Sequence, residues 1–152
     1  MRRLAGVCLI AILAATAGFA DDSGKKSSRS EAKAIVEKGV ELFAEKGAED
    51  AVRIINQRSK PFLDRDLYLF VIGPDGSIVA HAFDESRIGI PAEELYDEDG
   101  QPYGKLMLKL ANEEGTWVPY RQYNPVTKKV EPKSSYVRKA HGHIFGCGVY
   151  GD

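Results

Sequence analysis

Residues 67–82 limit the possible folds of this chain more than any other segment. Two apolar runs, residues 67–72 and 77–82, are rich in the β-branched and aromatic residues that favour strands. The four residues between them read Gly-Pro-Asp-Gly, which is typical of a tight turn. The segment therefore predicts a β-hairpin and, with it, a mainly antiparallel sheet.

Two helical patterns precede the hairpin. Apolar residues recur at helical spacing from Ala34 to Phe43, and we expect Ser30 to cap this helix and Gly47 to end it. A shorter pattern covers residues 48–57 and stops before Pro61.

One more helix and three more strands are expected after the hairpin. Residues 100–115 predict a crossover helix, and the strands are predicted at 116–123, 133–139 and 143–150, with Pro119 indicating an edge or a bulge. The order α-α-β-β-α-β-β-β predicts a PAS-like α+β fold. In it a long N-terminal helix packs on a mainly antiparallel five-stranded sheet, with the helices covering one side.

The first twenty residues have the pattern of a secretory signal peptide. Arg2 and Arg3 form a basic start, an apolar run of small and aliphatic residues follows, and cleavage is expected after Ala20. The run is shorter than the roughly 20 residues that cross a bilayer, so we expect no membrane anchor in the mature chain and a periplasmic or secreted protein. Residues 21–30 are small, polar and charged, and predict a flexible tail, which leaves 31–152 as a single domain.

Charge and cysteine usage exclude several function classes. The chain carries 21 Lys and Arg against 22 Asp and Glu, so it offers no electrostatic surface for nucleic acid. Cys8 lies in the predicted signal peptide, which leaves Cys147 without a disulfide partner. No nucleophile with a paired base, phosphate loop, zinc-protease helix or haem-attachment motif is present, so the sequence does not indicate an enzyme or a cofactor.

Four segments together resemble the single Cache domains, the extracytoplasmic sensor modules of bacterial chemoreceptors and histidine kinases. They are the hairpin with His81, the acidic run 97–100, the stretch 115–120, and residues 124–137 followed by 146–150. The resemblance implies a pocket on a curved sheet for a small molecule, commonly a short-chain carboxylate. Receptor Cache domains sit between two membrane helices, whereas a cleaved signal peptide and an end at Asp152 predict a free-standing member.

The resemblance makes Lys133 and Tyr136 the first candidates for ligand binding. A buried carboxylate needs a cation and neutral donors, and Lys, Tyr, Trp and Ser side chains supply them. Strand alternation, however, places Lys133 and Ser135 on one face and Tyr136 on the other. Lys133 could equally be a solvated strand lysine.

The remaining candidates are on neighbouring elements. Trp117 and Tyr120 face opposite sides of the third strand and could each bind ligand or belong to the core. Arg121 is a reserve carboxylate partner if it points inward. His81 either donates to a ligand or caps the strand end, and Tyr68 and Tyr103 are expected in the core or at the rim.

We therefore predict a periplasmic sensor module for acetate, propionate, pyruvate, lactate or a similar acid. It would act through a protein partner such as a membrane receptor, kinase or transporter. One alternative is a metal or redox protein that uses His141, His143 and Cys147, where the His-x-His spacing is compatible with zinc or copper. The other is a structural accessory subunit with a vestigial pocket.

Overall fold

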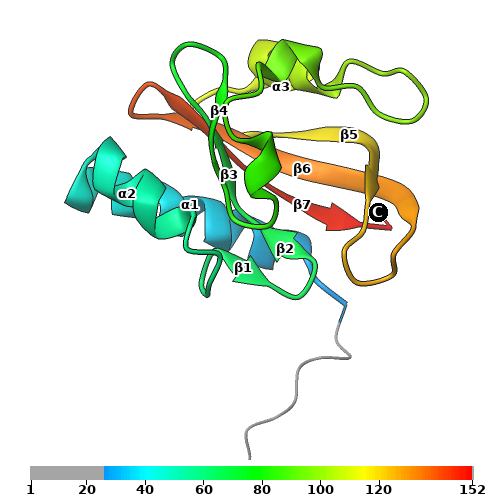
Figure 1. Ribbon diagram of the computed structural model, residues 1–152, viewed down its shortest axis with the longest axis horizontal. Helices are drawn as coiled ribbons and strands as arrows, with labels where there is room; N and C mark the ends of the chain where they lie inside the picture. The colour runs from blue at the N-terminus through cyan, green and yellow to red at the C-terminus, as the bar shows by residue number, and fades with distance from the viewer. Residues whose placement is uncertain (1–25, 152) are drawn as a thin grey trace, which may run out of the picture.

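The computed structural model describes residues 26–151 and has a five-stranded antiparallel sheet between two helical layers (Figure 1). The strand order is β4-β3-β7-β6-β5, which confirms the predicted α+β fold and its long N-terminal helix. The elements, in chain order, are α1 (Arg29–Lys46), α2 (Ala48–Ile55), β1 (Leu63–Asp64), β2 (Leu67–Tyr68), β3 (Phe70–Ile72), β4 (Ile78–His81), η1 (Glu85–Arg87), η2 (Ala92–Glu94), α3 (Tyr103–Leu110), β5 (Thr116–Tyr123), β6 (Val130–Ala140) and β7 (His143–Tyr150).

Helix α1 begins at Arg29, two residues before the expected start. The N-cap is Ser28 rather than Ser30: the Ser28 hydroxyl accepts from the Glu31 amide, and the Glu31 carboxylate accepts from the Ser28 amide at 2.8 Å. This reciprocal capping box satisfies two amide groups that a helix start otherwise leaves unpaired.

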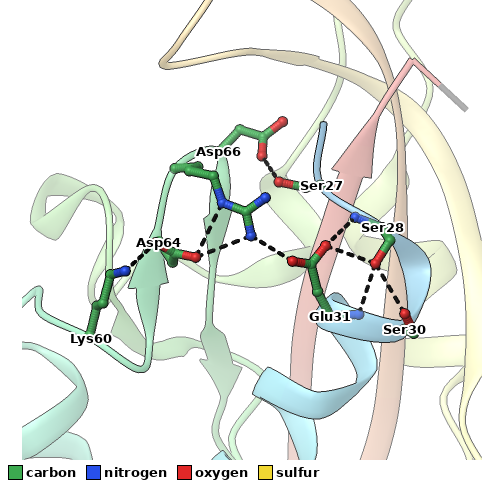
Figure 2. Close-up of polar contacts among 8 residues, drawn as sticks. Ser27, Ser28, Ser30, Glu31, Lys60, Asp64 and Asp66 are labelled. Carbon is green, nitrogen blue, oxygen red and sulfur yellow. Dashed lines mark hydrogen bonds and ion pairs between the residues drawn. The ribbon is translucent and has the colours of Figure 1, made fainter. Parts of the chain in front are cut away.

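Residues 26–30 are not the flexible tail that their composition predicts. Ser27 is buried and its hydroxyl donates to Asp66, while the Lys26 ammonium donates to the carbonyl of Gly151 at 3.1 Å. Figure 2 shows the contact of Ser27 with Asp66 near the ion pairs that Glu31 and Asp64 form with the Arg65 guanidinium. The start of α1 is thus fastened to the β1–β2 hairpin. The predicted signal peptide and residues 21–25 lie outside the described residues.

The first apolar run of the predicted hairpin divides into two strands. β2 pairs with β1, and β3 pairs with β4 and β7, because the amide of Leu69 donates to Phe62 instead of continuing one ladder. The turn at residues 73–76 is as expected, with Gly76 at φ 82°. Pro119 lies on β5, which is an edge strand as predicted.

The helices lie on both faces of the sheet, so the expectation that they cover one side is wrong. α1 packs on β6 and β7, where the Phe43 and Phe145 rings lie edge to face with their centroids 4.7 Å apart. α3 lies on the opposite face, where Tyr103 stacks on Tyr120 of β5 at 4.3 Å. Strands β4 and β5 are the two edges of the sheet, so their connection must cross the face that α1 leaves open. No helix within residues 26–151 is long and apolar enough to cross a bilayer.

Candidate functional site

The strand register decides which of the predicted site residues share a face. Lys133 of β6 lies opposite Tyr120 of β5 and Tyr150 of β7, on the face under α3. Ser135, two residues along, is on the same face, as the period of two predicts. Tyr136 lies opposite Trp117, on the face under α1.

A small cavity of about 20 Å³ lies between α3 and this face of the sheet. Two of the predicted residues, His81 and Tyr120, line it. The others in its wall are Tyr68, Phe70, Ile72, Ile78, Arg87, Leu95, Tyr103, Met107 and Gln122. A volume of this size holds about one water molecule, so the surrounding side chains nearly fill the cavity.

Lys133 is the most unusual residue beside the cavity, because its side chain is only 1% exposed. Its ammonium donates to the hydroxyl of Tyr68 at 2.5 Å and to that of Tyr150 at 3.3 Å, and lies 3.8 Å from the centre of the Tyr68 ring. No carboxylate within residues 26–151 forms an ion pair with it. Burial lowers the pKa of Lys133 to about 7, because the charged form loses its hydration.

Gly148 makes room for Lys133. A Cβ at Gly148 would lie 2.4 Å from Cε of Lys133 and 2.4 Å from Oγ of Ser135. The glycine on β7 therefore lets the lysine side chain lie flat across the sheet toward Tyr68.

Arg87 supplies a second cation, this time in the cavity wall. Its guanidinium donates to the Tyr103 hydroxyl at 3.0 Å and lies 3.4 Å from a carboxylate oxygen of Asp84. The pKa of Arg87 is raised, since the hydroxyl and carboxylate partners outweigh the effect of burial. The guanidinium therefore stays charged at the edge of an apolar cavity.

His81 is a neutral donor in the same wall. Burial lowers its pKa to about 3, and the charges of Arg87 and Lys133 add to that effect. Its Nδ1 accepts from the Asp84 amide at 2.9 Å, so Nε2 carries the proton. The ring thus caps the strand end, and the role of His81 as a donor to a ligand stays a prediction.

Tyr120 and Ser135 form a hydrogen-bonded pair beneath the cavity. Their hydroxyl oxygens are 2.9 Å apart, and Ser135 is fully buried. The pKa of Tyr120 is well above its usual value because of burial, so the hydroxyl remains protonated.

Three predicted site residues lie away from the cavity. Tyr136 donates to the carbonyl of Glu114, and its ring lies 5.5 Å from that of Trp117 under α1. Arg121 is on the same face as Trp117, at the sheet edge, with its guanidinium 3.7 Å from Asp99. The alternation along β5 and β6 places these three residues on the opposite face of the sheet from Lys133. The resemblance to Cache domains alone did not predict this separation.

The structure does not support a metal site formed by His141, His143 and Cys147. His141 is in the β6–β7 turn with φ 49°, and His143 packs its ring against Phe43. Cys147 is buried under α1, where burial raises the pKa of the thiol to about 12. Within residues 26–151 no three His, Cys, Asp or Glu side chains converge on one point.

Sequence reasoning missed several residues of the site. Arg87 lies in a polar connection with no periodicity, so nothing in the sequence marks it. Tyr68 and Tyr103 were expected only in the core or at the rim. Tyr150 was detectable, because a buried lysine needs acceptors and counting residues back from the turn at 141–142 places Tyr150 opposite Lys133.

A larger hollow of about 750 Å³ lies between residues 26–27, residues 124–132 and Gly151. Several of its polar side chains pair with one another: Ser27 donates to Asp66, and Asn124 donates to Glu131 at 2.7 Å. The small cavity is the stronger candidate, because Lys133 beside it is buried and has no carboxylate partner within residues 26–151.

The fold and the cavity define a small-molecule sensor domain. The chain belongs to the Single Cache domain 2 family, whose profile matches residues 13–152. This is a family of ligand-binding sensor domains without catalytic activity.

Solved structures agree on the fold. A methyl-accepting chemotaxis protein from Vibrio parahaemolyticus RIMD 2210633 is 21% identical, with a TM-score of 0.67 over 81% of this chain and 88% of that one. A Cache chemosensory domain described for carboxylic acid recognition is 19% identical, with a TM-score of 0.61 over 81% of this chain and 92% of that one. The periplasmic sensor domain of a chemotaxis protein is 20% identical, with a TM-score of 0.59 over 81% and 90%. A comparison with curated proteins gives no match.

Proposed function

We propose that this domain is an exported, periplasmic sensor for a short-chain carboxylate. The observation that carries the proposal is Lys133, a buried cation with no carboxylate partner in residues 26–151, next to a cavity that also holds Arg87. An unpaired charge in a dry site is costly, and an anion between the two cations offsets that cost. The apolar wall of the cavity suits a short alkyl tail.

Binding must enlarge the cavity. A volume of about 20 Å³ is smaller than acetate, so side chains have to move. Arg87 and Gln122 are only partly buried, and Met107 has a flexible side chain, so these three are the residues we expect to shift. A ligand that opens the site changes the populations of two conformations, which is how a sensor signals.

The affinity has an upper limit. A ligand of roughly four to six heavy atoms gains at most about −6 to −9 kcal/mol, which corresponds to a Kd around micromolar at best. The liganded form acts on a protein partner, a membrane receptor, kinase or transporter. Two of the similar solved structures are of chemotaxis proteins, which supports this kind of output.

A thermal-shift screen tests the proposal. The full chain is expressed with residues 1–20 in place, purified, and mixed with 1 mM acetate, propionate, pyruvate, lactate, short dicarboxylates or amino acids. For a Kd of about 10 to 100 µM, 1 mM ligand stabilises by roughly 1.4 to 2.7 kcal/mol, or several degrees.

Arg87→Ala should abolish the shift, and Arg121→Ala is the matched control because that arginine is outside the cavity. Failure of every carboxylate to stabilise the protein would leave the accessory-subunit alternative.

A further inference from the structure

We propose that the cavity takes up a proton together with its carboxylate ligand and that Lys133 Nζ receives it. This inference rests on the proposed function, and it adds that the affinity of the site is set by pH. The domain would then respond to both the pH and the concentration of the anion, rather than to the anion concentration alone.

The Lys133 ammonium contacts neutral groups in the structure. The ammonium has two tyrosine hydroxyls and two tyrosine rings around it, and the nearest groups of opposite charge are not in ion-pair contact. Hydroxyl and ring contacts stabilise an ammonium less than a carboxylate does. The neutral amine is therefore well populated at neutral pH, in line with a pKa of about 7.

An anion in the cavity acts on the charge state of Lys133. Lys133 does not line the cavity itself, but Tyr68 lies both in the cavity wall and against the Lys133 ammonium. A ligand carboxylate at the Tyr68 hydroxyl is therefore one hydroxyl away from Nζ. In a site that excludes water, an opposite charge at such range favours the protonated amine. Each binding event at neutral pH therefore draws a proton onto the fraction of Lys133 that was neutral.

The other groups facing Lys133 do not change their protonation between pH 6 and 9. His81 has its pKa lowered to about 3, Cys147 has its pKa raised to about 12, and the pKa of Arg87 is raised. The hydroxyls of Tyr68, Tyr120 and Tyr150 have raised pKa values because of burial. Asp66, which also acts on Lys133, accepts from Ser27. Lys133 is thus the group of this cluster that can take up the proton.

The hydroxyls around Lys133 form a hydrogen-bonded series that ends at a backbone carbonyl. The Tyr68 and Tyr150 hydroxyl oxygens are 3.2 Å apart, and the Tyr150 hydroxyl donates to the carbonyl of Tyr123 at 2.7 Å. A carbonyl oxygen has no proton to pass on, so this series does not supply Lys133 with a proton. The proton therefore enters with the ligand, when the cavity opens to solvent.

Isothermal titration calorimetry of the full chain with acetate and propionate tests the inference. At pH 6, 7, 8 and 9, each titration is repeated in two buffers of different ionisation enthalpy. The heat difference should show uptake of about 0.5 proton per ligand at pH 7 and about 0.9 at pH 8. The affinity should be nearly constant below pH 6 and fall about 100-fold between pH 6 and pH 9.

Two variants assign the proton to Lys133. Lys133→Arg holds a charge that does not titrate, so any binding it retains should be independent of pH and of buffer. Lys139→Arg, on the exposed end of the same strand, is the matched control and should behave as the wild type. If Lys133→Arg does not fold, Tyr68→Phe removes an acceptor of the ammonium, and the midpoint of the affinity profile should move below pH 7.

The outcomes separate the inference from the proposed function. Binding that is equally strong at pH 6 and 9, without buffer dependence, overturns the inference and leaves the sensor function standing. An affinity that falls tenfold per pH unit from about pH 5 upward would mean that the carboxyl group of the ligand carries the proton. This result also overturns the inference. Absence of binding by either acid at every pH overturns the inference, and if no carboxylate of the thermal-shift screen stabilises the protein either, the proposed function is overturned as well.

Discussion

Replacing Lys133 by methionine should stabilise the ligand-free protein at neutral pH. The side chain is buried, and its pKa is about 7 in the folded state against an ordinary value of 10.5. Between those two values the unfolded chain holds more protons than the folded one, so the free energy of unfolding rises with pH across this window. Relative to a neutral group, the lysine lowers the free energy of unfolding by about 4 kcal/mol at pH 7 and by about 2 kcal/mol at pH 9.

Methionine has a similar length and no charge, but it gives up the hydrogen bond to Tyr68, which is worth about 1 kcal/mol. The net gain expected at pH 7 is therefore about 3 kcal/mol. The lost hydrogen bond contributes equally at both pH values. The difference in unfolding free energy between the variant and the wild type should therefore shrink by about 2 kcal/mol from pH 7 to pH 9.

Urea denaturation of both proteins at pH 7, 8 and 9 measures this difference, with the midpoint shifting and the slope m unchanged. Lys139→Met, at the exposed end of β6, is the control and should change little at any pH. A variant that is less stable than the wild type at pH 7, or a difference that does not vary with pH, would refute the reasoning. Either result would mean that Lys133 is charged at little cost and serves as a structural residue.

Three further predictions concern the rest of the domain. Gly148→Ala should push Lys133 and Ser135 aside, lowering stability by about 1 to 3 kcal/mol and weakening carboxylate binding in calorimetry. Gly142→Ala is the control for affinity: its Cβ would meet only Cγ of Pro74, at 4.0 Å, and although the φ of 72° lowers the stability of the variant, its affinity should be unchanged. Ser28→Ala should cost about 1 kcal/mol in urea denaturation and Ser30→Ala much less, and equal effects would contradict Ser28 as the N-cap. Tyr136→Phe should leave the Kd for the ligand unchanged, because its hydroxyl is on the α1 face and bonds to Glu114, and a loss of binding would place it in the site after all.

The sequence predicts the elements well where their patterns are local. The hairpin turn, the strands β5 and β7 and the long helix follow from composition and periodicity within short windows. The start of α1 at Ser28 was missed, because a serine-rich segment looks like a tail unless Asp66 and Arg65, far along the chain, are known to hold it. Placing α3 on the second face also required the strand order, which no local pattern contains.

Only part of the candidate site was predicted, again because sequence patterns describe short segments and not how distant segments pack. Strand alternation alone correctly separated Lys133 and Ser135 from Tyr136, and the resemblance added Tyr136 back without a geometric basis. Arg87 lies on η1, a short turn after β4, and its side chain reaches the Tyr103 hydroxyl at the start of α3. Residues that reach a site from irregular connections have no periodicity to reveal them.

The two faces of the sheet divide stability and ligand response between them. The face under α1 holds the Phe43 and Phe145 contact, the Trp117 and Tyr136 pair and the ion pair of Arg138 with Glu37, all of which are satisfied without a ligand. The face under α3 holds the buried Lys133, which has no carboxylate partner within residues 26–151, and the cavity of about 20 Å³, and the proposed function places the anion there. Because the destabilising charge is confined to one face, an anion can strengthen that face without changing the other. The conformational response to the ligand should therefore be concentrated in α3, η1 and β5.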